Sequence, residues 1–188
     1  MMKNTLLGLI MLFFSFQSNA QQITWQCYNV VIDNPAAFTA VWDDFMQTDI
    51  GKSMSANAIF QFDFASSEFS STHQVCWFSD NPADLEENFI KFSNAKTMNT
   101  AGIWETWNEE VEQESAILGQ SLIADPAGFD LQFAVVYSIN VKDPGTYAAA
   151  FTEMKAAAEA SNGGQGTLEL HEVLAGGEPG VTHEVIVR

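Results

Sequence analysis

The stretch DNPAAFTAVWDDF, from Asp33 to Phe45, returns in weakened form as KDPGTYAAAFTEM, from Lys142 to Met154. Near the start of each, an amide or acid precedes a proline, as Asn34-Pro35 and Asp143-Pro144. The first residue supplies a capping side chain, and proline suits the first helical position. Apolar residues then follow at the spacing i, i+3, i+4, i+7, which predicts one buried stripe on each of two helices. The matched pairs of the two stripes are Phe38 and Tyr147, Val41 and Ala150, Trp42 and Phe151, and Phe45 and Met154.

The same entry occurs a third time, as Asp80-Asn81-Pro82, before an acidic stretch. It predicts a further helix over roughly Ala83 to Ser115, in which Ile103, Trp107 and Val111 have helical spacing. The motif is therefore a helix-start signal, and its aromatic residues are interpreted as core.

The repetition extends to strands on both sides of the helices. Alternating apolar and polar residues predict strands, and a further strand is expected near GQSLIAD, residues 119–125. The first copy thus reads β-α-β-β-α-β, the split βαβ order, whereas the second reads β-α-β-β and reaches Arg188 without its last helix and strand. A truncated chain is favoured over a short second repeat. The matched strand pairs are 27–32 with 136–141, 58–65 with 168–175, and 71–78 with 181–188.

This element order resembles the dimeric α+β barrel superfamily, which includes antibiotic-biosynthesis-type monooxygenases, EthD-like proteins and chlorite-dismutase-like haem proteins. The resemblance covers most of the chain after residue 20 but includes no signature motif of one subfamily. It implies an α+β fold of two tandem ferredoxin-like repeats with facing antiparallel sheets. We expect the first repeat over residues 21–127 and an incomplete second repeat over residues 128–188.

In this superfamily the helix-free faces of the two sheets enclose a lumen. Strand alternation assigns Tyr28 and Phe60 to the faces under the helices and leaves a mixed face of apolar and polar residues opposite. That makeup is typical of a small-molecule pocket, although a second structural core has about equal standing. The candidate ligand-binding residues on it are Asn29, Gln61, Asp63, Gln74, Ser138 and Asn140.

Cys27 and Cys76 are the only cysteines. An even count in an exported chain favours one disulfide over two buried thiols. The ferredoxin-like strand order implied by the resemblance sets the first strand beside the third, where the two cysteines can meet. The matching places in the second copy are apolar, Val136 and Ile186.

His171 is the histidine expected on the mixed face. A hairpin closing around Gly176-Gly177 places it opposite Glu184, with Glu169 two residues away. A histidine beside a carboxylate can act as a general base, so the candidate catalytic residues are His171, Glu169 and Glu184. A cross-strand polar pair without catalytic function is the competing interpretation, and it is favoured.

His73 and His183 occupy matching places after threonine, which favours a shared structural use. No metal site is predicted, because few ligands cluster in sequence. No cofactor is expected either. The haem proteins of the superfamily need an axial histidine and cationic groups, and this chain has seven Lys and Arg in all.

Near its start the chain has Lys3, an apolar run from Leu6 to Phe16 and then Ser18-Asn19-Ala20. This pattern predicts a signal peptide over residues 1–20, cleaved after Ala20, and a periplasmic or extracellular location. The run is too short to span a bilayer, so no membrane association is expected after cleavage.

The formal net charge of −17 disfavours nucleic acids and anionic membranes as partners, since both attract Lys and Arg. The function hypothesis is therefore binding of a small, partly apolar organic molecule in the lumen, with cofactor-independent monooxygenase- or isomerase-like turnover left open. The alternative is a non-catalytic interaction or assembly protein, and a homo-oligomer is left open.

Overall fold

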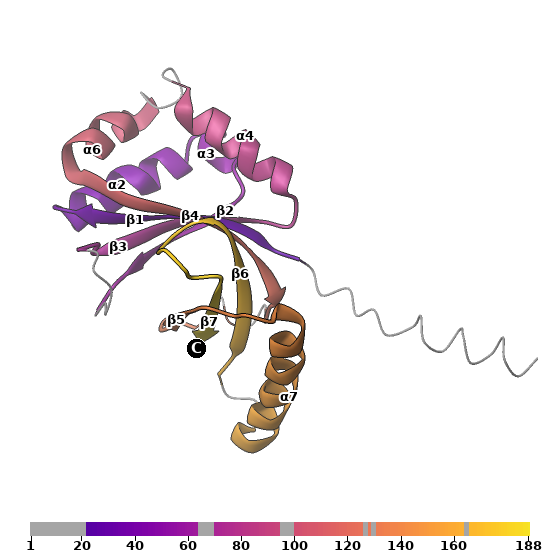
Figure 1. Ribbon diagram of the computed structural model, residues 1–188. Coiled ribbons are helices and arrows are strands. Elements are labelled where there is room, and N and C mark those ends of the chain that lie inside the picture. The colour runs from indigo at the N-terminus through magenta and orange to yellow at the C-terminus, as the bar shows by residue number, and fades with distance from the viewer. Residues whose placement is uncertain (1–21, 64–69, 95–99, 126–127, 129–130, 164–165) are drawn as a thin grey trace, which may run out of the picture.

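The structure is a computed structural model that describes residues 22–63, 70–94, 100–125, 128, 131–163 and 166–188 (Figure 1). The predicted signal peptide lies outside these residues. No helix in the described ranges is long and apolar enough to cross a membrane.

The strands form one seven-stranded antiparallel sheet with the order β2-β3-β1-β4-β6-β7-β5. The first four strands of this order are those of a ferredoxin-like unit, and β6-β7-β5 repeats the same order without a fourth strand. This confirms the α+β fold of two tandem ferredoxin-like repeats. The strands are β1 Thr24–Ile32, β2 Ala56–Gln61, β3 His73–Ser79, β4 Val111–Ile123, β5 Val135–Ile139, β6 Leu168–Gly176 and β7 His183–Val187.

The helices lie on the outer side of the curled sheet. In Figure 1 those of the first half cover one side of β1–β4, and β5–β7 curl beneath the other side. We call the helix-covered side the outer face and the helix-free side the inner face. The first half has helices α2 Pro35–Met46, α3 Asp49–Lys52, α4 Pro82–Ser93, the 3-10 turn η1 Thr100–Gly102 and α6 Ile103–Glu110, and the second half has α7 Pro144–Asn162.

The three Asx-Pro entries cap helices as predicted. The side chains of Asn34, Asn81 and Asp143 each accept a hydrogen bond from a backbone N–H in the first turn of α2, α4 and α7. Each proline stands at the start of its helix, where a missing N–H is harmless.

The predicted helix over Ala83 to Ser115 is wrong in extent. Helix α4 ends at Ser93, α6 ends at Glu110, and β4 begins at Val111. Ile103 and Trp107 therefore lie in a helix as expected, whereas Val111 pairs with Ile32 of β1. The apolar spacing did not distinguish the last helical turn from the first residues of a strand.

The sheet bends where its halves join. Strand β4 changes register against β6 between Leu118 and Gly119 and again between Ser121 and Ile123. Such irregularities bend and twist a strand, which here turns β5–β7 under the first half. The inner faces of the halves consequently lie opposite one another (Figure 1).

Two clusters separate the faces of the first half. On the outer face, Val30, Phe38 and Trp42 belong to the main core. On the inner face, Trp25, Cys27, Cys76 and Ile117 form a second cluster, with Phe60, Phe78 and Val173 packed against it. The alternation predicted for β1, β3 and β6 is confirmed by this division.

The alternation predicted for β2 is wrong by one residue. Phe60 was expected under the helices, but it is paired with Gln74 and packs on the inner-face cluster, whereas Ile59 packs on the outer core. Both sides of this strand are apolar, so its pattern could not show which side faces the helices.

Candidate functional site

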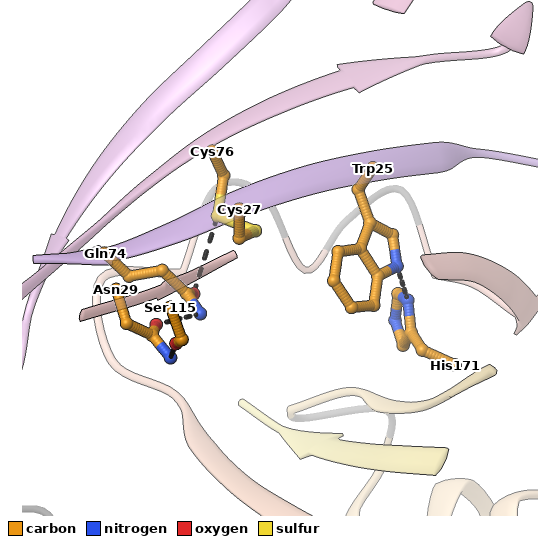
Figure 2. Close-up of a disulfide and its surroundings, with 7 residues drawn as sticks. All are labelled: Trp25, Cys27, Asn29, Gln74, Cys76, Ser115 and His171. Atoms are coloured by element: carbon orange, nitrogen blue, oxygen red, sulfur yellow. Dashed lines mark hydrogen bonds between the residues drawn. A yellow bond between two sulfur atoms is a disulfide. The ribbon is translucent and has the colours of Figure 1, made fainter. Parts of the chain in front are cut away.

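Trp25 extends from β1 across β4 to reach β6. Its register partner on β4 is Gly119, where an added Cβ would lie only 2.2 Å from the indole ring. The absence of a side chain at this position therefore lets the indole lie over β4. Its N–H donates a 2.9 Å hydrogen bond to Nδ1 of His171 (Figure 2).

His171 uses both ring nitrogens in this arrangement. Nδ1 accepts the indole N–H, and Nε2 lies 3.1 Å from Oε2 of Glu169. An acceptor at Nδ1 places the proton on Nε2, so the imidazole is neutral and donates to Glu169. The ring is 6% exposed and has no free lone pair for a substrate proton. In this arrangement His171 presents no free lone pair, and its role as a general base stays a prediction.

Glu169 is buried and its charge is compensated. Its Oε1 lies 3.3 Å from Nη1 of Arg188, and its Oε2 accepts from His171. The carboxylate and guanidinium side chains are 2% and 7% exposed. Buried ionised groups persist when paired in this way, so Trp25, His171, Glu169 and Arg188 form one closed polar chain, which we call the inner relay.

Glu184 lies directly beside this relay but is not part of it. It pairs in register with His171 of β6 and Ser138 of β5, as the sequence predicted for His171. Glu184 is 9% exposed, and within the described ranges no hydrogen bond or ion pair involves its carboxyl group. Burial raises the pKa of Glu184 to about 7, and the charge of Glu178 adds to the rise.

Asn29 and Gln74 meet on the inner face near the disulfide (Figure 2). Gln74 donates to Oδ1 of Asn29 at 2.9 Å, and Asn29 donates to the hydroxyl of Ser115 at 3.0 Å. These two candidate ligand residues are therefore brought together, but much of their hydrogen-bonding capacity is used within the protein. Ser115, which the sequence placed in a helix, is the third member of this cluster.

The other four candidate ligand residues are dispersed. Gln61 is exposed and pairs with His73 on the outer face, and Asp63 is exposed beyond the end of β2. Ser138 is exposed on β5 on the same face as Glu184. Asn140 follows β5 and lines a shallow hollow beside α7. Only Ser138 is near the predicted catalytic residues.

The predicted disulfide is present. Cys27 and Cys76 are register partners on β1 and β3, with Cα atoms 4.1 Å apart and the sulfurs bonded (Figure 2). The bridge and its apolar neighbours occupy much of the inner face of the first half. These side chains restrict the space for a ligand between the two halves of the sheet, on the side of the first half.

The residues do not fit a haem. An axial histidine needs a free ring nitrogen, and both nitrogens of His171 are engaged by Trp25 and Glu169. Arg188, a cation on this face, is held by Glu169. His73 and His183 each pair with a neighbouring threonine through Nδ1, and they lie on the outer face, where Nε2 of His183 is buried without a hydrogen-bond partner among the described residues. Among the described residues no group of three His, Cys, Asp or Glu side chains could hold a metal ion.

Trp25 and Arg188 are the site residues whose function the sequence did not indicate. Trp25 has the same strand parity as Cys27, so alternation alone places it on the inner face. Its partner on β6 is set by the glycine at 119 and by the bend between β4 and β6. No sequence pattern predicts such a contact across an intervening strand.

Comparison with known proteins supports the fold. No protein-family model matches the sequence, and no curated protein matches it. Two variants of chlorite dismutase from Candidatus Nitrospira defluvii are similar in structure, each with a TM-score of 0.50 and 10% sequence identity. The alignments cover 88% of this chain and 75% and 76% of those chains. At this identity the likeness establishes a shared ferredoxin-like α+β fold.

Proposed function

We propose that this protein binds a small, partly apolar organic molecule on the inner face of its second half, with Glu184 as the principal polar contact. The observation that carries the proposal is that Glu184 is buried and unpaired, whereas its neighbours in the inner relay are satisfied. The carboxyl oxygens of Glu184 are not among the fully buried unpaired atoms of the described residues, so a small molecule can reach the carboxyl group and supply a partner. A ligand with a hydrogen-bonding group would supply that partner.

The surroundings of Glu184 suit a ligand that is apolar on one side. Val136 and Ile186 are register partners on the same inner face, each two residues along its strand from the pair Ser138 and Glu184. Ser138 adds a hydroxyl at the exposed edge. This combination of apolar wall and few polar groups is typical of small-molecule sites.

Any proton transfer at this site is assigned to Glu184. A carboxyl group with a pKa of about 7 can both accept and release a proton near neutral pH. His171 lacks a free lone pair, so it acts by positioning the relay. Isomerase-like proton transfer is therefore better supported than a monooxygenase reaction, for which no specific arrangement is present among the described residues.

The test is a ligand panel measured by thermal shift at pH 6 and pH 8, using aromatic alcohols, aromatic amines and fatty acids. At least one class should raise the melting temperature of the wild type. Glu184→Gln should weaken that binding by about tenfold to a hundredfold, since a hydrogen bond to a charged group contributes roughly 1.5–3 kcal/mol. Glu153→Gln, at an exposed site on α7, is the matched control and should leave binding unchanged.

Unchanged stability across the whole panel would contradict ligand binding. Equal binding by Glu184→Gln and the wild type would contradict the assigned contact. The proposed export is tested separately, by the mass of the mature protein from an exporting host, which should begin at Gln21.

A second candidate function is assembly through β5. This edge strand exposes Val135, Val136 and Tyr137, which are 38%, 48% and 55% exposed, and it carries no charge in a strongly acidic chain. In the order of the first repeat a fourth strand pairs at this edge, so β5 can accept such a strand or β5 of a second copy, antiparallel about a twofold axis. Native mass spectrometry should then show a dimer that Tyr137→Lys dissociates, whereas a monomeric wild type would exclude it.

A further inference from the structure

A cavity lies on the opposite side of the sheet from Glu184. It has a volume of about 350 Å³ and is formed between the outer face of the first half and helices α4 and α6. Figure 1 shows these two helices on the same side of the first-half strands. The volume lies within the range of roughly 300–1,000 Å³ that small-molecule sites occupy.

The wall of this cavity is aromatic, and its described residues carry no formal charge. Strands contribute Tyr28, Trp77, Gln26 and Gln113, and the helices contribute the rest. The described lining residues include no Asp, Glu, Lys or Arg, in contrast to a chain that has 24 acidic residues. The aromatic members are Tyr28, Trp77, Phe89, Phe92, Trp104 and Trp107.

The rings of the wall are held by one another. Trp77 lies 5.5 Å from Phe92 and 5.8 Å from Tyr28 between ring centroids, both edge to face, and Phe92 lies 5.7 Å from Trp107. Edge-to-face packing of this kind is favourable and restricts ring motion. The cavity therefore has preformed walls for a flat molecule.

Trp77, one of the lining residues, carries a hydrogen-bond donor that no described group uses. Its indole N–H is buried and has no hydrogen-bond partner among the described residues. A buried N–H without an acceptor is costly, and native proteins usually satisfy it. Tyr28 stays a neutral phenol, because burial raises its pKa, an effect that hydrogen bonding to Gln26 opposes.

The mouth of the cavity exposes large apolar side chains. Phe89 on α4 is 57% exposed and Trp104 on α6 is 39% exposed. Aromatic rings that line a cavity and also reach solvent offer stacking surface to a ligand that enters between them.

We propose that this cavity binds an uncharged, flat aromatic molecule that carries a carbonyl or similar acceptor for the indole N–H of Trp77. An anionic ligand is disfavoured by the uncharged lining and the acidic surface around it. A cationic group is attracted by aromatic rings but cannot itself accept the indole N–H of Trp77, so the acceptor is the feature that the ligand must carry. The site is distinct from that of Glu184, since the sheet separates the two faces.

The test uses Prodan, a neutral naphthalene ketone whose emission responds to polarity and to hydrogen bonding at its carbonyl. Wild-type protein should bind one Prodan saturably, with energy transfer from tryptophan to the dye. The anionic dye anilinonaphthalene sulfonate should bind more weakly.

Two variants locate the binding. Trp77→Phe keeps an aromatic ring but removes the donor, and it should weaken Prodan binding by about three- to tenfold. Because it also removes part of a buried core ring, it should lower the free energy of unfolding, which urea unfolding measures separately. Ser93→Phe fills the cavity from α4 and should abolish binding, whereas Ser161→Phe, on the exposed end of α7, is the matched control and should not.

Glu184→Gln should leave Prodan binding unchanged, which separates this site from the one proposed on the inner face. The proposal is overturned if Ser93→Phe binds Prodan as the wild type does, or if Trp77→Phe binds it equally well. Loss of Prodan binding in Glu184→Gln would also overturn it, by placing the dye on the other face.

Discussion

Helices α2 and α7 begin with the same signal but are buried to different extents. In α2 the residues Phe38, Trp42 and Phe45 are 0%, 3% and 0% exposed. In α7 Phe151 is 2% exposed, whereas Met154, the counterpart of Phe45, is 50% exposed. Helix α2 packs against α3, η1 and α6, whereas the main contacts of α7 are with strands β4 and β6. The burial of a repeated stripe thus depends on the neighbouring helices as well as on the stripe.

The largest expected difference between the halves is at this matched pair. Phe45→Ala should lower the free energy of unfolding by about 3–5 kcal/mol, because it empties a fully buried site. Met154→Ala should lower it by under about 1 kcal/mol, since half of that side chain is already in water. Urea unfolding followed by circular dichroism measures both. Equal losses would show that the two helices are equally packed.

The disulfide is the second difference between the halves. Cys27→Val combined with Cys76→Ile copies the apolar pair Val136 and Ile186 into the first half. Closing the intervening loop contributes up to about 4 kcal/mol by chain entropy, so the double variant should be less stable by that amount or less. Reduced wild-type protein is the control and should match the variant. A variant as stable as the oxidised wild type would mean that packing compensates the lost bridge.

Glu184, in the second half, should make the free energy of unfolding depend on pH. Its raised pKa means that the folded state keeps the proton while the unfolded chain loses it near pH 4.5. The resulting penalty is therefore absent below pH 4.5, grows as the pH rises to about 7, and is constant above, at about 3 kcal/mol.

Glu184→Gln should remove that penalty, so it should stabilise the protein at pH 8 and have little effect at pH 4.5. Chemical denaturation at both pH values measures the difference, and Glu153→Gln is the control. A gain of equal size at both pH values would show that ionisation of Glu184 is not the cause.

The smallest expected effects are at the caps. Asn34→Ala should cost about 1 kcal/mol at any pH, because an amide cap does not titrate. Asp143 is different, since hydrogen bonds from Thr146 lower its pKa. Its stabilising effect is present at neutral pH and is lost as the pH falls through that lowered pKa. Asp143→Ala should therefore destabilise at pH 7 but much less near pH 3, as followed by thermal unfolding.

Local patterns were sufficient for much of the fold. Caps, helix stripes and strand alternation predicted the element order and the register of His171 with Glu184. These features depend on residues close in sequence or on one hairpin. The Cys27–Cys76 pairing came instead from the cysteine count and from the strand order that the resemblance implies. The limits of the repeats at residues 127 and 128 and the signal peptide stay predictions.

The predictions failed where two periodicities overlapped. The apolar spacing of Ile103, Trp107 and Val111 is helical, yet β4 begins at Val111. Strand β2 is apolar on both sides, so Gln61 and Phe60 were assigned to the wrong faces. In both regions the local pattern is compatible with two structures, and packing against neighbouring elements decides between them.

The sequence by itself determined where the helices begin, which strand positions alternate, and that the chain contains a duplication, because each depends on local geometry. Tertiary structure alone decided which contacts the polar side chains of the inner face make. A bend at β4 and a glycine at 119 bring the indole of Trp25 to His171, which occupies the lone pair that a general base would need. The same folding leaves Glu184 buried without a partner, and burial and pairing are properties of the packed chain.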